Sequence, residues 1–208
     1  MIIAVDGPLA SGKGTIARAL AARFGLPHLD TGTLYRATGL AVMDTRTDPA
    51  DVEACAKLAR NLNINRIDAD RIRTAEAGAM ASKVASIPQV REALFELQRS
   101  FANQPGGAIL DGRDIGTVIC PDAEVKLYVT ADAETRARRR WEELRARGEM
   151  LSYDDMLAQT LERDRRDAGR ADAPMRAAED ATLLDTSSLS IDAAVAQAIR
   201  IVEKRQKA

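Results

Sequence analysis

Short apolar runs alternate with longer amphipathic stretches along most of the chain. Ile2 to Val5 is a continuous apolar run that ends at a polar, glycine-containing loop, which is typical of a buried parallel strand. A shorter run starts at His28, and further runs lie at 108–110, 125–129 and 182–184. The alternation predicts an α/β protein with a central five-stranded parallel sheet.

Helical periodicity fills the segments between these strands. From Lys13 to Phe24 apolar residues recur every three or four positions, and Gly25 with Pro27 is a typical helix end. Further helices are expected over 34–44, 49–61, 75–86, 89–103, 133–147, 153–168 and 191–204. Helices that connect parallel strands cover both faces of the sheet, so three layers are expected.

The alternation is interrupted between Thr47 and Phe101. This stretch offers helices and one weak strand-like piece, from Asn63 to Ile67, before the next strand of the sheet. No linker separates it from the rest, although 104–107 is a clear loop. We therefore expect a single domain over 1–208 with an inserted lobe at about 47–101.

Composition narrows the class of partner. The chain has 208 residues, 46% of them hydrophobic, and a formal net charge of -1, which leaves no global field to hold a nucleic-acid backbone. Cys55 and Cys120 lie far apart and there is one histidine, which disfavours a zinc site. No stretch reaches transmembrane length, so we expect a cytoplasmic protein that binds small anions and no membrane.

The loop after the first strand carries the clearest chemical signal. Gly7 and Gly12 precede Lys13 between a strand and a helix, so backbone N–H groups, the helix dipole and a lysine can converge on a triphosphate. A glycine-rich turn that only caps a helix is the alternative. The predicted ATP-binding residues are Gly7, Pro8, Leu9, Ala10, Ser11, Gly12, Lys13, Gly14 and Thr15.

The position after the lysine departs from the usual phosphate-loop pattern. Gly14 stands where a serine or threonine is common, and the hydroxyl of Thr15 comes one residue later. This form resembles that of nucleoside monophosphate kinases. The displaced hydroxyl disfavours a direct bond from Thr15 to Mg²⁺, so we assign no metal ligand and expect the ion to be bound mainly through nucleotide phosphates and water.

Three further segments extend this resemblance to one family. The motifs at 29–36, 110–117 and 162–167, together with the phosphate loop, are similar to those of bacterial cytidylate kinases and occur in the family's order. The resemblance covers nearly the whole chain. It implies a P-loop fold with an inserted NMP-binding lobe, a short lid at about 147–172, and a monomer that transfers the γ-phosphoryl group of ATP to CMP and dCMP.

Several residues of these motifs suit an acceptor nucleotide. Arg36 offers a guanidinium fork for phosphate unless it is a solvated surface residue, and Asp111 can hold a magnesium-bound water unless it only caps a helix. The resemblance assigns Arg113 to the CMP phosphate and Asp114 to its ribose or base, with a structural turn as the alternative. The N-terminal motifs sit at the carboxyl ends of strands, where such sheets bind ligands.

The resemblance also places the cytosine-reading positions in the lobe, at Ser82 and Arg91. Arg91 can donate to O2 and N3 of cytosine, while Ser82 accepts from the N4 amine. Between Leu62 and Thr74 the lobe is shorter than in bacterial family members. The predicted CMP-binding residues are Thr31, Tyr35, Arg36, Ser82, Arg91, Asp111, Arg113, Asp114, Arg163 and Asp167.

The resemblance implies that the late arginine-rich segment supplies the catalytic charge. Arg163, Asp167 and Arg170 fall on one stripe if the helix continues that far, and the resemblance assigns the arginines to the transferring phosphoryl group and Asp167 to the acceptor nucleoside. A salt-bridged solvated face competes for Arg165 and Arg166. The predicted catalytic residues are Lys13, Arg113, Arg163 and Arg170.

Three functions other than that of a cytidylate kinase remain open. A kinase of another acceptor, such as AMP, UMP or a metabolite alcohol, would share the phosphate loop, and a non-catalytic ATP-dependent switch would bind nucleotide without turnover. The arginines at 136–147 around Trp141 would suit RNA binding, but glutamates interleave with them. His28 is expected to be structural.

Overall fold

A computed structural model describes residues 1–63 and 67–206. The chain divides into two compact units, one formed by Met1–Leu29 with Arg99–Ala208 and the other by Asp30–Gln98. The strand-like piece expected at 63–67 includes residues 64–66, which lie outside the described residues.

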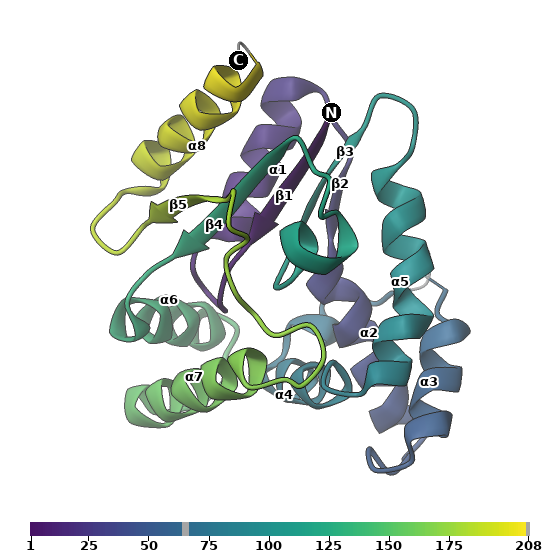
Figure 1. Cartoon of the computed structure of the whole chain (residues 1–208). Helices are drawn as coiled ribbons and strands as arrows, with labels where there is room; N and C mark the ends of the chain where they lie inside the picture. The colour runs from purple at the N-terminus through teal and green to yellow at the C-terminus, as the bar shows by residue number, and fades with distance from the viewer. Residues whose placement is uncertain (64–66, 207–208) are drawn as a thin grey trace. The chain divides into compact units, whose positions relative to one another are not determined.

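The first unit is built on the expected sheet. Its strands are β1 (Ile2–Asp6), β2 (His28–Asp30), β3 (Ala108–Gly112), β4 (Val125–Thr130) and β5 (Thr182–Asp185), in the order β2-β3-β1-β4-β5 (Figure 1). β1 is central and runs parallel to both β3 and β4, and β4 runs parallel to β5. The five-stranded α/β fold predicted from the sequence is confirmed.

Helices of the first unit cover this sheet. They are α1 (Lys13–Phe24), α6 (Ala133–Ala146), α7 (Tyr153–Ala168) and α8 (Ile191–Gln206), with a short π-helical turn, η3 (Ile115–Ile119). α1 and α8 pack against the sheet through a core that includes Ile3, Leu20 and Ile109 (Figure 1). Ala4 and Leu110, which point to the opposite face, are also fully buried, so both faces are covered.

The end of α1 follows from its sequence. Gly25 adopts a left-handed conformation with φ of 64° and donates its N–H to the carbonyl of Ala21, which closes the helix after Phe24 as predicted.

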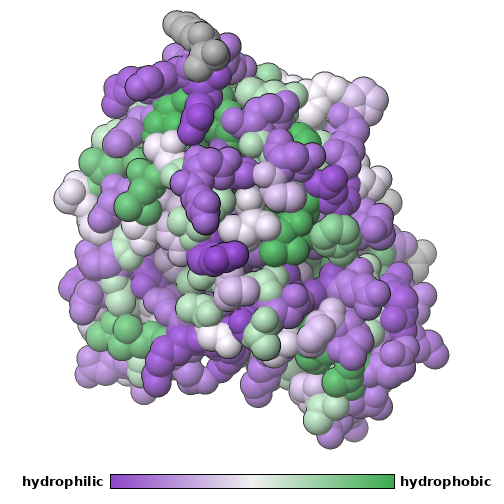
Figure 2. All heavy atoms as spheres, in the orientation of Figure 1, coloured by the Kyte–Doolittle hydropathy of each residue, from purple (hydrophilic) through white to green (hydrophobic). Residues whose placement is uncertain are grey.

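The face shown in Figure 2 is mostly hydrophilic, with apolar residues in small separate patches. No helix among the described residues is long and apolar enough to cross a membrane.

The second unit is helical. It contains α2 (Thr31–Asp44), α3 (Val52–Arg60), the short η2 (Arg71–Arg73), α4 (Ala75–Val84) and most of α5 (Pro88–Ala102). This unit overlaps the lobe expected at about 47–101 but begins earlier, at Asp30, because α2 packs against α4.

Two helices start three residues away from the expected positions. α2 begins at Thr31 rather than 34, directly after the extended residue Asp30. α3 begins at Val52 rather than 49, because the carboxylate of Asp51 accepts from the N–H of Ala54 and caps the helix there.

The crossing of α2 and α4 depends on a glycine. A Cβ built on Gly39 would lie 2.9 Å from the backbone nitrogen of Ala81 and 3.2 Å from the carbonyl carbon of Met80. The two backbones therefore approach so closely that the position has no room for a side chain.

We expect Gly39→Ala to lower the free energy of unfolding by about 1–3 kcal/mol, because the added methyl pushes α2 away from α4. Helix propensity alone would give the opposite sign, a gain of about 1 kcal/mol. Urea unfolding followed by circular dichroism measures the difference. Unchanged or increased stability would show that the crossing can relax without loss.

Candidate active site

The phosphate loop has the backbone geometry that its glycines permit. Gly7 has a φ of 147°, and a Cβ there would lie 1.9 Å from the carbonyl oxygen of Val129. Gly12 precedes α1 with a φ of 90°, and the intervening Ala10 also has a positive φ, of 59°. The chain therefore turns tightly and enters α1 with the positive end of the helix dipole at the loop.

Side chains brace this loop from both sides. The Lys13 ammonium folds back and donates to the carbonyl of Pro8 at 3.2 Å. The hydroxyl of Thr186, which follows β5, donates to the carbonyl of Ser11 at 2.9 Å and accepts from Arg139 at 3.0 Å. Ser11 is fully buried, and its hydroxyl has no hydrogen-bond partner in the part of the chain that the structure describes. The hydrogen bonds to the carbonyls of Pro8 and Ser11 hold the loop backbone in one conformation directly before the N-terminus of α1.

Asp111 lies beside the loop. It is buried within β3, and its Oδ2 lies 3.8 Å from the position of a Cβ on Gly14, in the first turn of α1. Its Oδ1 lies 2.7 Å from Nε2 of His28. His28 therefore has more than a packing role, because it orients a carboxylate at the loop.

Asp6 was not singled out from the sequence, yet it organises the neighbouring segment. Its buried carboxylate accepts from the N–H of Ile115 and from the N–H of Gly116, each at 2.8 Å. Burial raises the pKa of Asp6 to about 7, against the opposing effect of these two hydrogen bonds. The two bonds join the end of β1 to the residues directly after Arg113 and Asp114. The sequence signal that could have identified Asp6 was an acidic residue at the end of a buried apolar strand.

Arg113, Arg163 and Arg170 converge on one carboxylate. Nε of Arg113 donates to Oδ2 of Asp167 at 3.0 Å, Nε of Arg163 lies 3.7 Å from the same oxygen, and Arg170 binds Oδ1. The Asp167 side chain is only 1% exposed. Burial raises its pKa, but the three guanidinium groups outweigh that effect and hold the pKa below its usual range.

This cluster differs from the expected helical stripe in one respect. α7 ends at Ala168, so Arg170 reaches Asp167 from beyond the end of the helix. Three guanidinium groups gathered at one carboxylate concentrate positive charge in this part of the unit, which suits a polyanionic ligand.

The arginines on α6 make internal contacts. Arg136 and Arg140 are buried, and Arg140 pairs with Glu143 at 2.8 Å. Arg138 and Arg145 lie over the rings of Tyr153 and Trp141. The segment therefore serves helix packing to a large extent.

In the second unit, the expected acceptor residues lie on three helices. Thr31 is buried at the start of α2, and Tyr35 and Arg36 are half-buried on the same helix. Nη1 of Arg36 donates to the carbonyl of Ile72 at 3.0 Å, so the alternative of a solvated surface arginine is wrong. Ser82 on α4 and Arg91 on α5 are 1% and 6% exposed, which also excludes a surface role.

Comparison with known proteins decides the family. The sequence model described as Cytidylate kinase matches residues 3–204. The chain belongs to the cytidylate kinase family. The resemblance inferred from the motifs, and with it the class of phosphotransferase, is confirmed.

Relatives of this cytidylate kinase family member match over almost their whole length. A cytidylate kinase of Methylocella silvestris is 56% identical over 98% of this chain and 94% of its own. One of Xanthobacter autotrophicus is 56% identical over 99% of both chains, and one of Cereibacter sphaeroides is 57% identical over 98% and 96%.

Solved structures share the fold at low sequence identity. An uncharacterized protein from Eubacterium ventriosum superposes with a TM-score of 0.54 at 15% identity and covers 98% of each chain. TT1252 from Thermus thermophilus gives a TM-score of 0.51 at 22% identity and covers 98% of this chain and 96% of its own. These similarities support the architecture of the family member.

The buried Asp6 predicts a pH dependence of stability. Its folded pKa, about 7, lies above the ordinary value of 3.8, so its contribution to stability is full below about 3.8 and is lost as the pH rises through about 7. Relative to Asp6→Asn, the unmodified protein should lose about 2–3 kcal/mol of unfolding free energy between about pH 5 and pH 8.

Urea unfolding of both proteins at the two pH values measures this difference. The nearby charges of Arg113 and Asp114 act on Asp6 in opposite directions and are present in both proteins. Asp122→Asn is the control, because the lowered pKa of that exposed carboxyl keeps it ionised across this range. A pH-independent difference for Asp6→Asn would mean that Asp6 is ionised throughout.

Proposed function

We propose that the chain transfers the γ-phosphoryl group of ATP to CMP and dCMP, which yields ADP and CDP or dCDP. The observation that carries this proposal is the convergence of Arg113, Arg163 and Arg170 on Asp167 in the unit that also holds the phosphate loop. Phosphoryl transfer requires concentrated positive charge next to a triphosphate site, and the family supplies the identity of the acceptor.

On the donor side, the residues from Gly7 to Thr15 surround the ATP phosphates. The loop amides and the helix dipole bind the oxygens, and Lys13 exchanges its contact with the Pro8 carbonyl for the β- and γ-phosphates. Loop atoms, rather than base-specific side chains, account for most of this binding.

Mg²⁺ fits beside this loop as a partly hydrated ion. Among the described residues there is no cluster of three or more metal-binding side chains, whereas the single carboxylate of Asp111 faces Gly14. One carboxylate with water and phosphate oxygens is a common environment for Mg²⁺. Asp111 would hold a metal-bound water, and the ion, when bound, neutralises charge on the donor phosphates.

On the acceptor side, Arg36 and Arg113 bind the CMP phosphate, and Asp114 binds the ribose or base. Ser82 and Arg91 read the cytosine, with Thr31 and Tyr35 completing the site. The burial of Ser82, Arg91 and Asp114 supports this assignment, because polar groups held in a buried setting are fixed in orientation and can read a ligand specifically.

The chemistry needs no general base. An acceptor phosphate with a second pKa of about 6 is already largely a dianion at neutral pH. One of its oxygens attacks the γ-phosphorus in line, the bond to the bridging oxygen breaks, and ADP leaves. Arg113, Arg163 and Arg170 stabilise the charge that develops on the transferring group.

We also propose how the enzyme closes over its substrates, where it acts and what it binds. The inserted lobe at about 47–101 and the lid at about 147–172 close over the substrates and exclude water. The enzyme acts as a cytoplasmic monomer, and its partners are ATP and CMP or dCMP, with no nucleic acid or membrane. The nearly balanced charge of the chain supports the choice of small-molecule partners.

The deciding experiment measures ADP formation from ATP and Mg²⁺ with CMP, dCMP, UMP and AMP as separate acceptors. We expect fast turnover with CMP and dCMP and its loss in Lys13→Ala. Turnover with UMP or AMP alone would retain the kinase class but overturn the cytosine assignment. Binding of ATP without turnover of any acceptor would favour a nucleotide-dependent switch.

We expect Arg113→Ala and Arg163→Ala each to lower kcat by about 10³-fold or more, because each removes a positive charge from the transferring group. Arg165→Ala is the matched control, since Arg165 is exposed on the same helix as Arg163. Steady-state kinetics with CMP measures the effect, and thermal unfolding tests whether the variants remain folded. A near-normal kcat in both variants would refute these roles.

A further inference from the structure

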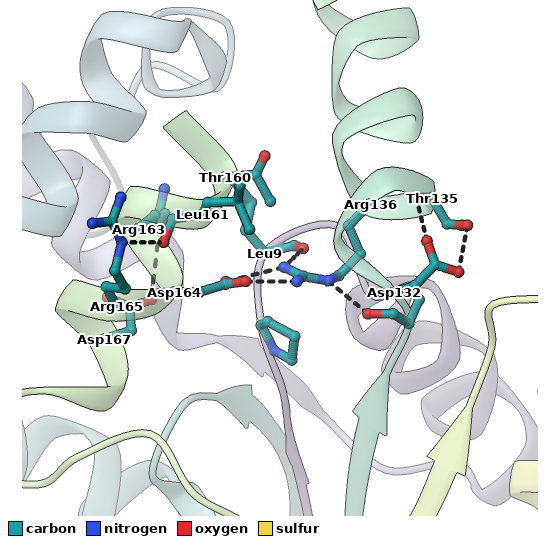
Figure 3. A network of polar contacts seen from close by, with 12 residues as sticks. Leu9, Asp132, Thr135, Arg136, Thr160, Leu161, Arg163, Asp164, Arg165 and Asp167 are labelled. Atoms are coloured by element: carbon teal, nitrogen blue, oxygen red, sulfur yellow. Dashed lines mark hydrogen bonds and ion pairs between the residues drawn. The ribbon is translucent and has the colours of Figure 1, made fainter. Parts of the chain in front are cut away.

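Arg136 joins three segments of the first unit through one guanidinium group. Nε donates to the carbonyl of Ala131 at 2.8 Å, and Nη1 and Nη2 donate to the carboxylate of Asp164 at 3.0 Å and 2.6 Å. Nη1 also donates to the carbonyl of Leu9 at 3.4 Å. Figure 3 shows the guanidinium between the strand end, the loop and α7.

Two of the segments that Arg136 joins carry the groups proposed to bind the ATP phosphates and to stabilise the transferring phosphoryl group. Leu9 lies within the phosphate loop, and its carbonyl is part of the loop backbone. Asp164 lies on α7 directly after Arg163 and three residues before Asp167, so it shares a turn of helix with the arginine cluster (Figure 3). One side chain of α6 therefore touches both the loop and the helix that carries the catalytic charge.

The chemistry of the contact favours a geometric role. The bidentate pairing fixes the guanidinium relative to the carboxylate in distance and in orientation. The Arg136 side chain is only 6% exposed and that of Asp164 is 25% exposed. A buried ion pair is a weak source of stability compared with apolar packing, but it imposes a specific arrangement on the groups that it joins. A lysine ammonium lacks the planar fork of donors, so it could not keep the bidentate pairing with Asp164.

We propose that Arg136 is a positioning residue that, through Asp164, holds Arg163 and Asp167 on α7 in register with the phosphate loop. This inference rests on the proposed roles of the loop and of Arg163 in phosphoryl transfer. It predicts that loss of the contact displaces the charge cluster relative to the γ-phosphate while the substrates still bind.

The test uses Arg136→Lys and Asp164→Asn, which break the pairing from opposite sides. We expect each to lower kcat by about 10- to 100-fold, the effect of a small misplacement, with the KM for ATP and CMP nearly unchanged. The double variant should be no worse than the more affected single variant, because both remove the same contact. Arg145→Lys changes an exposed arginine on the same helix whose ring contact, with Trp141, stays within α6; it is the control and should behave as the unmodified enzyme.

A second background separates positioning from a merely structural role. In Arg163→Ala the group to be positioned is absent, so adding Arg136→Lys should lower kcat much less than it does in the unmodified enzyme. A full additional loss of kcat in that background would overturn the proposal. A second outcome would also overturn it. If Arg136→Lys changes only the KM for ATP and Asp164→Asn does not change it, then Arg136 contacts the nucleotide itself.

Hydrogen exchange keeps the proposal testable apart from activity. If Arg136→Lys does not fold, the test rests on Asp164→Asn alone. We expect this variant to fold because the asparagine amide oxygen still accepts one hydrogen bond. Amides of 153–168 should exchange faster in folded Arg136→Lys and Asp164→Asn than in Arg145→Lys. Equal exchange would overturn the tether, whether or not the unmodified chain turns over CMP. Absence of turnover in the unmodified chain would instead refute the proposed function.

Discussion

Three guanidinium groups share one buried carboxylate, and the arrangement of charge in the first unit depends on that contact. Arg113 comes from the segment after β3, while Arg163 and Arg170 come from α7 and the residues beyond it. Like charges at this distance would repel one another in a medium that screens poorly. Asp167 offsets that repulsion in the absence of ligand, so three guanidinium groups can lie together in a folded protein.

The groups that support this cluster are buried polar side chains at the carboxyl ends of the strands. Asp6 holds the segment after Arg113 through two backbone N–H groups, and Arg136 links the loop carbonyl of Leu9 to α7. Each has partners for its charge, which is the condition under which a buried ionisable group is tolerated. The raised pKa of Asp6 shows that burial still opposes ionisation there despite those partners.

Sequence periodicity predicted the elements well, and the errors have local causes. α2 starts at Thr31 because Asp30 is extended and ends the strand, whereas the threonine and glycine at its start weaken the apolar pattern from which the start at 34 was inferred. Asp6 and Arg136 were missed for a different reason. The role of Asp6 depends on Ile115 and Gly116, more than a hundred residues away, and that of Arg136 on Leu9 and Asp164 in two other segments. A local pattern can mark the residue type but not these partners.

The sequence by itself determined the fold class, the phosphate loop and the family, because these depend on local order: glycine spacing, the strand–loop–helix context and motifs in a fixed succession. Tertiary structure alone decided which charges neutralise one another. It showed that Ser82 and Arg91 are buried and that Arg36 is half-buried and bound to a backbone carbonyl, and it gave His28 a carboxylate partner in Asp111. The physical reason is that burial and Coulomb interactions depend on distance in space, which the chain sets only after the sheet and helices have packed.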